Sequence, residues 1–211
     1  MGKSGRYGKY GETKRFARLR KAGKGLTGGG RGLGASRIQS FRSTSSYGDE
    51  ITIIPARTKD ADYIRSLSKK VFTRYGPYDD TLTGWFMSGF AWTVLASAGK
   101  RPVGFAMLGR TVHDHPISRV YELLAIAVAP EMQKRAIGSR LLNKIERKAK
   151  EQHAETLILH TSADNAPARK LFRKHGFVTA ETKENFYPRG QDALMMVKKF
   201  VCNCSGSSVE D

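Results

Sequence analysis

The sequence predicts a mixed α/β fold, with a partly parallel central sheet flanked by helices. From Glu50 onward, short β-branched or apolar runs alternate with segments whose apolar residues recur at helical spacing. Two of the later runs are apolar almost throughout, as strands buried on both faces of a sheet are, and a helical segment follows each of them. Strands followed by crossover helices indicate a sheet with a parallel portion.

The first half of this region predicts one helix and three strands. The expected elements are a strand at 51–55, a helix at 61–72, and strands at 92–97 and 103–112. The helix is predicted because Ile64, Leu67 and Val71 fall on one face. Gly99 to Pro102 has the composition of a hairpin turn between the two later strands.

The second half predicts the parallel portion. The expected elements are a strand at 121–128, a helix after Pro130, a strand at 156–160, a helix ending at Gly176 and a strand at 193–197. Apolar residues from Ile137 to Ile145 define the inner face of the first helix. Asp164 or Asn165 can cap the second helix, and Pro167 suits its first turn.

Charge divides the chain near residue 49. The net charge of the 211 residues is +18, and residues 1–48 hold 12 Lys or Arg against one acid. This segment is rich in glycine and has few apolar side chains, so its folding could not offset its ordering entropy. We expect residues 1–48 to be a disordered basic extension, residues 49–200 to form the folded domain, and residues 201–211 to be a disordered tail.

The basic extension has several interpretations. Its Lys and Arg, with interspersed aromatic residues, could bind RNA or a ribosome by neutralising phosphates and stacking on bases. A solvated tail without a specific partner fits the same composition. A mitochondrial transit peptide is also Arg-rich and acid-poor, although the glycine content opposes the amphipathic helix such peptides form.

Other features narrow the class of protein. The two cysteines, Cys202 and Cys204, form neither a disulfide framework nor a zinc motif. No apolar run approaches the roughly 18 residues of a spanning helix, and no apolar secretory segment is found. We therefore expect a cytoplasmic protein without a membrane partner. The turn His113 to His115 has metal-ligand residue types, but three adjacent side chains rarely converge on one ion, so no metal is assigned.

The connection after the strand at 121–128 is a candidate phosphate site. Its residues are Gln133, Lys134, Arg135, Ala136, Ile137, Gly138 and Ser139. A loop of small residues entering a helix presents backbone N–H groups and the positive end of the helix dipole. From the residues alone, an ordinary strand-to-helix connection is the favoured interpretation.

The order of motifs resembles the acyl-CoA-dependent N-acetyltransferase superfamily, in which a Q/R-x-x-G-x-G/A loop holds the coenzyme's pyrophosphate. The loop at 133–139 is similar, with Ala136 in place of the first glycine. A second block at 157–177 contains Asn165, and a third, at 185–188 and 192–196, resembles the ribosomal-protein-alanine acetyltransferase branch. The resemblance covers residues 51–200.

The resemblance implies acetyl-CoA as co-substrate, bound where the strands at 121–128 and 156–160 separate. Backbone groups of Ala127 and Val128 would polarise the thioester, the loop at 133–139 would hold the pyrophosphate, and Asn165 would contact the pantetheine arm. Alternatively, Asn165 is only a helix cap.

The resemblance also suggests catalytic residues. Glu122 resembles the catalytic glutamate of histone-acetyltransferase relatives, and Tyr187 the tyrosine that protonates the leaving thiolate. His160 stands where the ribosomal-protein branch usually has a glutamate, so either Glu122 or His160 could be the base. The alternatives are a Glu122 that pairs with Arg119, a structural His160 and a Tyr187 that only packs.

The sequence therefore predicts an acetyl-CoA-dependent N-acetyltransferase. The resemblance to the ribosomal-protein-alanine branch implies a protein N-terminal α-amine as the leading acceptor. Freeing an α-amine of its proton at pH 7 costs about 1 kcal/mol, against about 4.6 kcal/mol for lysine, so a base helps both and the lysine more. Lysine, polyamine and small-molecule amines remain alternatives. A catalytically weak ribosome- or RNA-binding protein is the alternative from another class.

Overall fold

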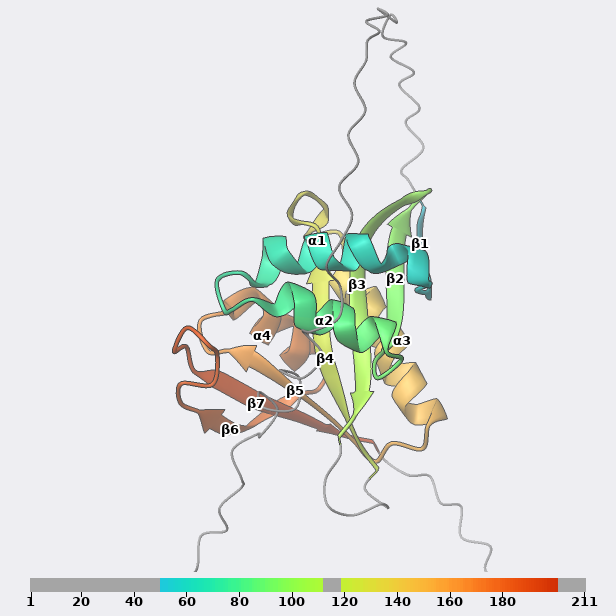
Figure 1. The fold of residues 1–211 in the computed structure, drawn as a ribbon. Helices are drawn as coiled ribbons and strands as arrows, with labels where there is room; N and C mark the ends of the chain where they lie inside the picture. The colour runs from blue at the N-terminus through green and yellow to red at the C-terminus, as the bar shows by residue number, and fades with distance from the viewer. Residues whose placement is uncertain (1–49, 112–118, 201–211) are drawn as a thin grey trace, which may run out of the picture. The chain divides into compact units, whose positions relative to one another are not determined.

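A seven-stranded sheet lies between two helical layers in the structure, a computed structural model that describes residues 50–111 and 119–200 (Figure 1). The strand order is β1-β2-β3-β4-β5-β7-β6. The strands are β1 (Ile51–Pro55), β2 (Trp92–Ala98), β3 (Arg101–Arg110), β4 (Val120–Val128), β5 (Thr156–Ser162), β6 (Val178–Lys183) and β7 (Ala193–Lys199). The expectations for residues 1–48, 113–116 and 201–211 lie outside the described residues.

The predicted mixed sheet is confirmed, and its parallel part is small. Among the described strands, β4 and β5 are the one parallel pair, and every other neighbouring pair is antiparallel. The crossover between β4 and β5 is α3 (Ile137–Glu151), the helix predicted after Pro130. β7 lies between β5 and β6, so the last two strands extend the sheet by antiparallel pairing.

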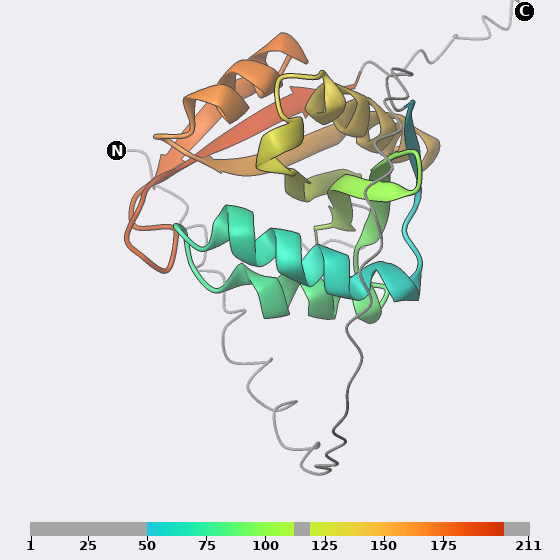
Figure 2. The same cartoon turned by 90° about the horizontal axis from the view of Figure 1, so that it is seen from above.

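Four helices cover the two faces of the sheet (Figure 2). On one side lie α1 (Ala61–Phe72) and α2 (Tyr78–Met87), and on the other lie α3 and α4 (Ala166–Lys174). Ile137, Leu141, Leu142 and Ile145 of α3 are fully or almost fully buried, as their spacing predicts. Among the described helices, none is long and apolar enough to cross a membrane.

Two elements, α2 and β6, were not expected. Helix α2 contains Gly84 and buries only Leu82 and Thr83, so it lacks a clear apolar stripe. Strand β6 is an edge strand whose residues are exposed or half-buried, so it lacks the alternation of a half-buried strand. Both elements depend on tertiary contacts more than on local pattern.

Candidate active site

The parallel strands β4 and β5 pair over only part of their lengths. Val120–Leu123 lies opposite Thr156–Leu159, and pairing ends there although β4 continues to Val128 and β5 to Ser162. On their outer sides, β4 remains paired with β3 and β5 with β7. The end of β4 therefore has an unpaired edge toward β5, where the sequence predicts the coenzyme.

A bulge in β4 lies next to the point of separation. The β3–β4 register shifts between Met107 and Leu108, so that Leu124 has no partner on β3. Gly109 makes room for this residue, since a Cβ there would come within 2.6 Å of Leu124 Cδ1. A bulge bends its strand and increases the local twist. The bulge accounts for β4 turning away from β5 here.

Hydrogen bonding identifies which backbone groups face the unpaired edge. The N–H of Ala129 donates to the carbonyl of Val103 at 2.8 Å. The alternation of an antiparallel ladder then directs the N–H of Ala127 toward β3 and that of Val128 away from it. Gln133 Nε2 donates to the carbonyl of Val128 at 3.2 Å, on this same open side. Of the two predicted donors, Ala127 and Val128, only Val128 directs its N–H toward the unpaired edge.

The loop at 133–139 has an anion-binding geometry. Lys134 and Ala136 adopt left-handed backbone conformations, with φ of 61° and 59°. Ala136 is the N-cap of α3 and supplies no side-chain acceptor, and the first helical bond runs from the N–H of Arg140 to its carbonyl. The N–H groups of the first turn, Ile137 to Ser139, therefore have no acceptor within the helix and are available to an anion.

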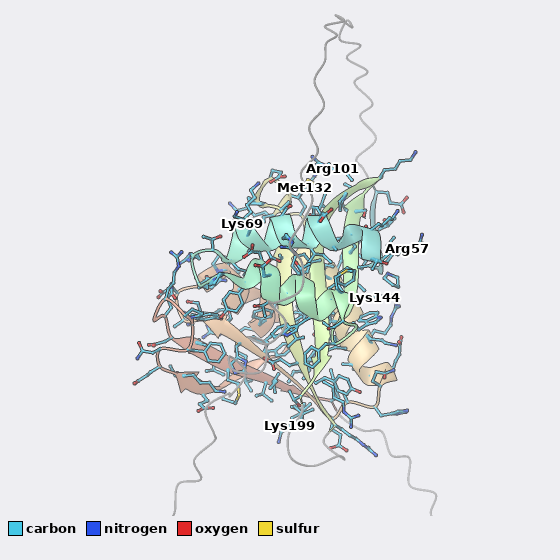
Figure 3. The ribbon with its side chains drawn as sticks, in the orientation of Figure 1. Arg57, Lys69, Arg101, Met132, Lys144 and Lys199 are labelled. Atoms are coloured by element: carbon cyan, nitrogen blue, oxygen red, sulfur yellow. The ribbon has the colours of Figure 1, made fainter. Side chains whose placement is uncertain are left out.

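Two arginine side chains meet at Met132, the residue before this loop. Arg101 Nη2 and Arg135 Nη1 lie 3.5 Å and 3.3 Å from Met132 Sδ. Figure 3 labels Arg101 and Met132 side by side at one end of the sheet.

At Ala136, a side chain in the left-handed region costs about 1 kcal/mol relative to glycine. The loop thus keeps its anion-binding form at a conformational cost.

The two candidate bases lie in contact. His160 Nδ1 is 2.8 Å from Glu122 Oε1, and the two side chains are only 7% and 17% exposed. Glu122 lies in the last paired stretch of β4, and His160 is the first residue of β5 beyond it. The His160 ring stacks on Phe186 with a centroid distance of 4.7 Å. Arg119 pairs instead with Glu155 at 3.1 Å, so it is not the partner of Glu122.

Tyr187 lies in an aromatic cluster beside this pair. Its ring centroid is 4.9 Å from Tyr75, 5.2 Å from Phe186 and 6.3 Å from Tyr78. Burial, together with Tyr78, Tyr75 and the charge of Glu122, raises the pKa of the Tyr187 hydroxyl well above its ordinary value. Burial also raises the pKa of Tyr78. The Tyr187 phenol therefore stays neutral, and able to donate its proton, throughout the physiological pH range.

Tyr187 lies in the connection between β6 and β7, which is held against the connection between α1 and α2. Gln191 accepts the N–H of Tyr187 on its carbonyl at 3.1 Å, and its Nε2 donates to the carbonyl of Arg74 at 2.6 Å. A Cβ at Gly76 would lie 2.8 Å from Pro188 Cγ, so the connections pack closely. They lie side by side in both ribbon views (Figure 1, Figure 2). Sequence analysis missed this contact, although the aromatic residues around a Gly-Pro turn at 75–78 were a usable signal.

Asn165 acts as a helix cap. Its Oδ1 accepts the N–H of Ala168 at 3.2 Å at the start of α4, as the capping interpretation predicts. In the part of the chain that the structure describes, His, Cys, Asp and Glu side chains form no group of three or more that could hold a metal ion. The predicted site residues thus form two groups, the loop at 133–139 and the Glu122–His160 pair beside Tyr187.

Comparisons with known proteins agree on one family. The family model described as "Acetyltransferase (GNAT) family" matches residues 61–177. An N-alpha-acetyltransferase of Sulfurisphaera tokodaii is 24% identical over 169 residues, covering 71% of this chain and 93% of that protein. A [ribosomal protein bS18]-alanine N-acetyltransferase of Salmonella typhimurium is 36% identical over 77 residues, covering 35% of this chain and 52% of that protein.

A solved structure shows the same fold. The protein yncA from Salmonella typhimurium, whose structure was solved "with its cofactor Acetyl-CoA", superposes with a TM-score of 0.64. The two are 16% identical, and the match covers 73% of this chain and 96% of that one.

Proposed function

The chain belongs to the acetyltransferase (GNAT) family, whose members use acetyl-CoA to acetylate amines, and we propose that its acceptor is the α-amino group of a protein N-terminus. Both curated relatives described above carry names of this class, one an N-alpha-acetyltransferase and the other specific for the alanine of a ribosomal protein. An α-amine also needs less help to lose its proton than a lysine does. A ribosomal protein is the substrate class that the second relative suggests.

The loop and the unpaired edge of β4 fit acetyl-CoA. The first-turn N–H groups of α3, with Lys134 and Arg135, would hold the pyrophosphate, and Val128 N–H would donate to the thioester carbonyl. Asn165 Oδ1 is used by the helix cap, so its amide nitrogen is the group left for the pantetheine arm. The bound coenzyme supplies the activated acetyl group.

The observation that carries the proposal is the buried contact between Glu122 and His160 where β4 and β5 separate. We assign the pair one task, accepting the proton that the acceptor's ammonium must lose. A carboxylate that accepts the Nδ1–H of an imidazole orients the ring and stabilises its protonated form. Stacking on Phe186 limits rotation of the ring further. The pair therefore acts as one proton acceptor, whichever atom receives the proton first.

Tyr187 is assigned the opposite proton transfer. Its phenol is neutral at physiological pH, as an ordinary tyrosine is, and burial raises its pKa further. A neutral phenol can donate to the thiolate that leaves when the thioester is cleaved. Gln191 fixes the backbone of this tyrosine, because it accepts the N–H of Tyr187 and donates a hydrogen bond to the carbonyl of Arg74.

The test compares two peptides of identical sequence that contain one lysine. One peptide has a free α-amine and an acetylated lysine, and the other has a blocked N-terminus and a free lysine. With acetyl-CoA and the full chain, we expect mass spectrometry to find acetylation of the first peptide only. A library of N-terminal residues then defines the preferred first residue. Equal acetylation of both peptides would reject α-amine specificity, and turnover with neither would reject both acceptor classes.

Two further expectations stay predictions. Cytoplasmic location is proposed from the cysteine content and tested by cell fractionation. Contact of residues 1–48 with RNA or the ribosome is proposed from their 12 Lys or Arg against one acid. Deleting residues 1–46 should weaken RNA binding in a salt-dependent way and leave acetyl-CoA affinity unchanged.

A further inference from the structure

Helix α4 carries an uninterrupted positive charge. Its nine residues include four cations, Arg169, Lys170, Arg173 and Lys174, and no acid. Arg169 is half-buried, and the other three residues are exposed. The exposed side of α4 is therefore positive along its whole length.

No carboxylate offsets this charge within the described part of the chain, because none of the ion pairs found there includes a residue of α4. Arg169 Nη1 donates to the carbonyl of Ala163, which leaves its charge in place. On α3, by contrast, Arg147 and Lys148 both lie within 4 Å of Glu151. A helix that only kept the surface solvated would more often carry both signs of charge, as α3 does.

Three of the four cations of α4, Arg169, Lys170 and Arg173, point away from the coenzyme loop. Leu171 packs toward Gly138, where a Cβ would come within 3.3 Å of Leu171 Cδ2, and Phe172 is buried. A helix turns about 100° per residue, so Lys170 lies about 100° from Leu171, Arg169 and Arg173 lie about 160° from it, and Lys174 lies about 60° from it. The face formed by Arg169, Lys170 and Arg173 is thus separate from the side of α4 that meets the start of α3.

We propose that the exposed face of α4 is a docking surface for the phosphate backbone of RNA. Arginine and lysine neutralise phosphates and release counterions, whereas the apolar residues Leu171 and Phe172 of this helix face inward. A membrane-surface helix needs exposed apolar side chains to insert, and α4 exposes none of any size. RNA is favoured over an acidic protein because the same chain has a second cationic, glycine-rich segment at 1–48.

This surface is independent of the acceptor assigned above, and charge reversal tests it. The full chain with Lys170→Glu and Arg173→Glu is titrated against a fluorescently labelled RNA hairpin at several salt concentrations. Two lost phosphate contacts should lower the affinity by about tenfold or more and reduce the slope of log K against log salt by about 1.4 to 1.8. The matched control reverses the charges of Lys59 and Lys69, which are both exposed. Lys59 lies just before α1 and Lys69 within it, and α1 covers the other face of the sheet (Figure 3).

Each outcome decides the proposal. A loss confined to the α4 variant supports it, whereas equal losses in both variants would mean that net charge alone controls RNA binding and would overturn it. Unchanged RNA affinity of the α4 variant would also overturn it. Thermal-shift titration with acetyl-CoA and acetylation of a free peptide should match wild type. If coenzyme affinity falls while RNA binding persists, the surface belongs to the coenzyme site and the proposal is wrong, whereas loss of peptide acetylation in wild type would reject only the proposed function.

Discussion

Two carboxylate–histidine pairs in this domain have similar local chemistry and different surroundings. Glu122 and His160 lie 2.8 Å apart, and Glu146 and His175 lie 3.2 Å apart, and all four side chains are largely buried. The second pair has a further partner, because Lys198 Nζ lies 2.7 Å from Glu146 Oε2. Glu146 therefore has a permanent cation as well as an imidazole.

The difference indicates which pair can exchange a proton in a reaction. Glu146 joins α3, the end of α4 and β7, so its contacts hold the sheet and the helical layer together. Glu122 and His160 lie where two strands separate, beside the aromatic cluster of Tyr187. A buried carboxylate and histidine are thus not by themselves evidence of catalysis, and the elements around them decide the role.

The largest predicted effect is a loss of turnover when the Glu122–His160 pair is changed. Glu122→Gln should lower turnover by about 10²-fold at pH 7, the usual scale for a positioned acid or base. Raising the pH should recover part of the loss, because more of the amine is then already free of its proton. The measurement is a pH profile of acetylation with one acceptor peptide.

Glu146→Gln is the matched control for that experiment, because it makes the same change in the other buried pair. Its turnover at a temperature where the domain is folded should stay near wild type. His160→Ala should reproduce the loss of Glu122→Gln if the two residues act as one unit. A near-normal profile for both site variants would leave catalysis to positioning and to the amine's own ionisation.

The second prediction concerns the free energy of unfolding, which Glu146→Gln should lower more than Glu122→Gln. Glu146→Gln should lower the free energy of unfolding by about 2 kcal/mol, because Lys198 and His175 lose a shared buried carboxylate. Glu122→Gln should cost less, since it leaves no permanent cation without its acid. Urea unfolding of both variants measures the difference, and equal losses would contradict the assignment of a structural role to Glu146.

Much of the fold was predictable, because most elements carry their own pattern. The apolar faces of α1 and α3 and the buried strands β4 and β5 follow from spacing alone. Helix α2 and strand β6 have weak patterns, so sequence analysis missed them. The position of α2 is set by packing against α1, and that of β6 by pairing with β7, rather than by a pattern within each segment.

The sequence predicted which residues belong to the site, but not which of them contact one another. Glu122, His160 and Tyr187 were expected from the resemblance, but Glu122 and His160 were considered as alternatives. Their contact depends on the register of two parallel strands joined by a long crossover, which no local pattern encodes. The hydrogen bond from Gln191 to Arg74 was missed for the same reason, since the two residues are 117 positions apart in the chain.

The third prediction concerns the coenzyme loop and keeps it separate from the catalytic pair. Ala136 has a φ of 59°, a conformation that glycine adopts at less cost. Ala136→Gly should therefore tighten acetyl-CoA binding by up to about 1 kcal/mol, several-fold in affinity. Thermal-shift titration measures the change. The 10²-fold effect of Glu122→Gln should be the same with either residue at 136, and a large interaction between the two variants would contradict the separation.

The last prediction concerns stability at alkaline pH, an effect that is absent at neutral pH. The pKa of Tyr187 is raised in the folded domain above its unfolded value of about 10. Its contribution to stability is therefore fully present below pH 10 and declines above it, because the unfolded chain loses this proton first. The decline is at most about 1.4 kcal/mol per pH unit for one group.

Tyr187→Phe removes this titration, so the variant should lose less stability than wild type between about pH 9.5 and 11. Tyr63 and Tyr78, whose pKa values are also raised, should account for a remaining decline. Urea unfolding across this range measures the difference, with Tyr121→Phe as a control that removes the hydroxyl of another half-buried tyrosine. Parallel stability curves for wild type and Tyr187→Phe would mean that the hydroxyl is not desolvated. The catalytic role is tested separately at pH 7, where near-normal turnover of Tyr187→Phe would mean that the proton for the leaving thiolate comes from water.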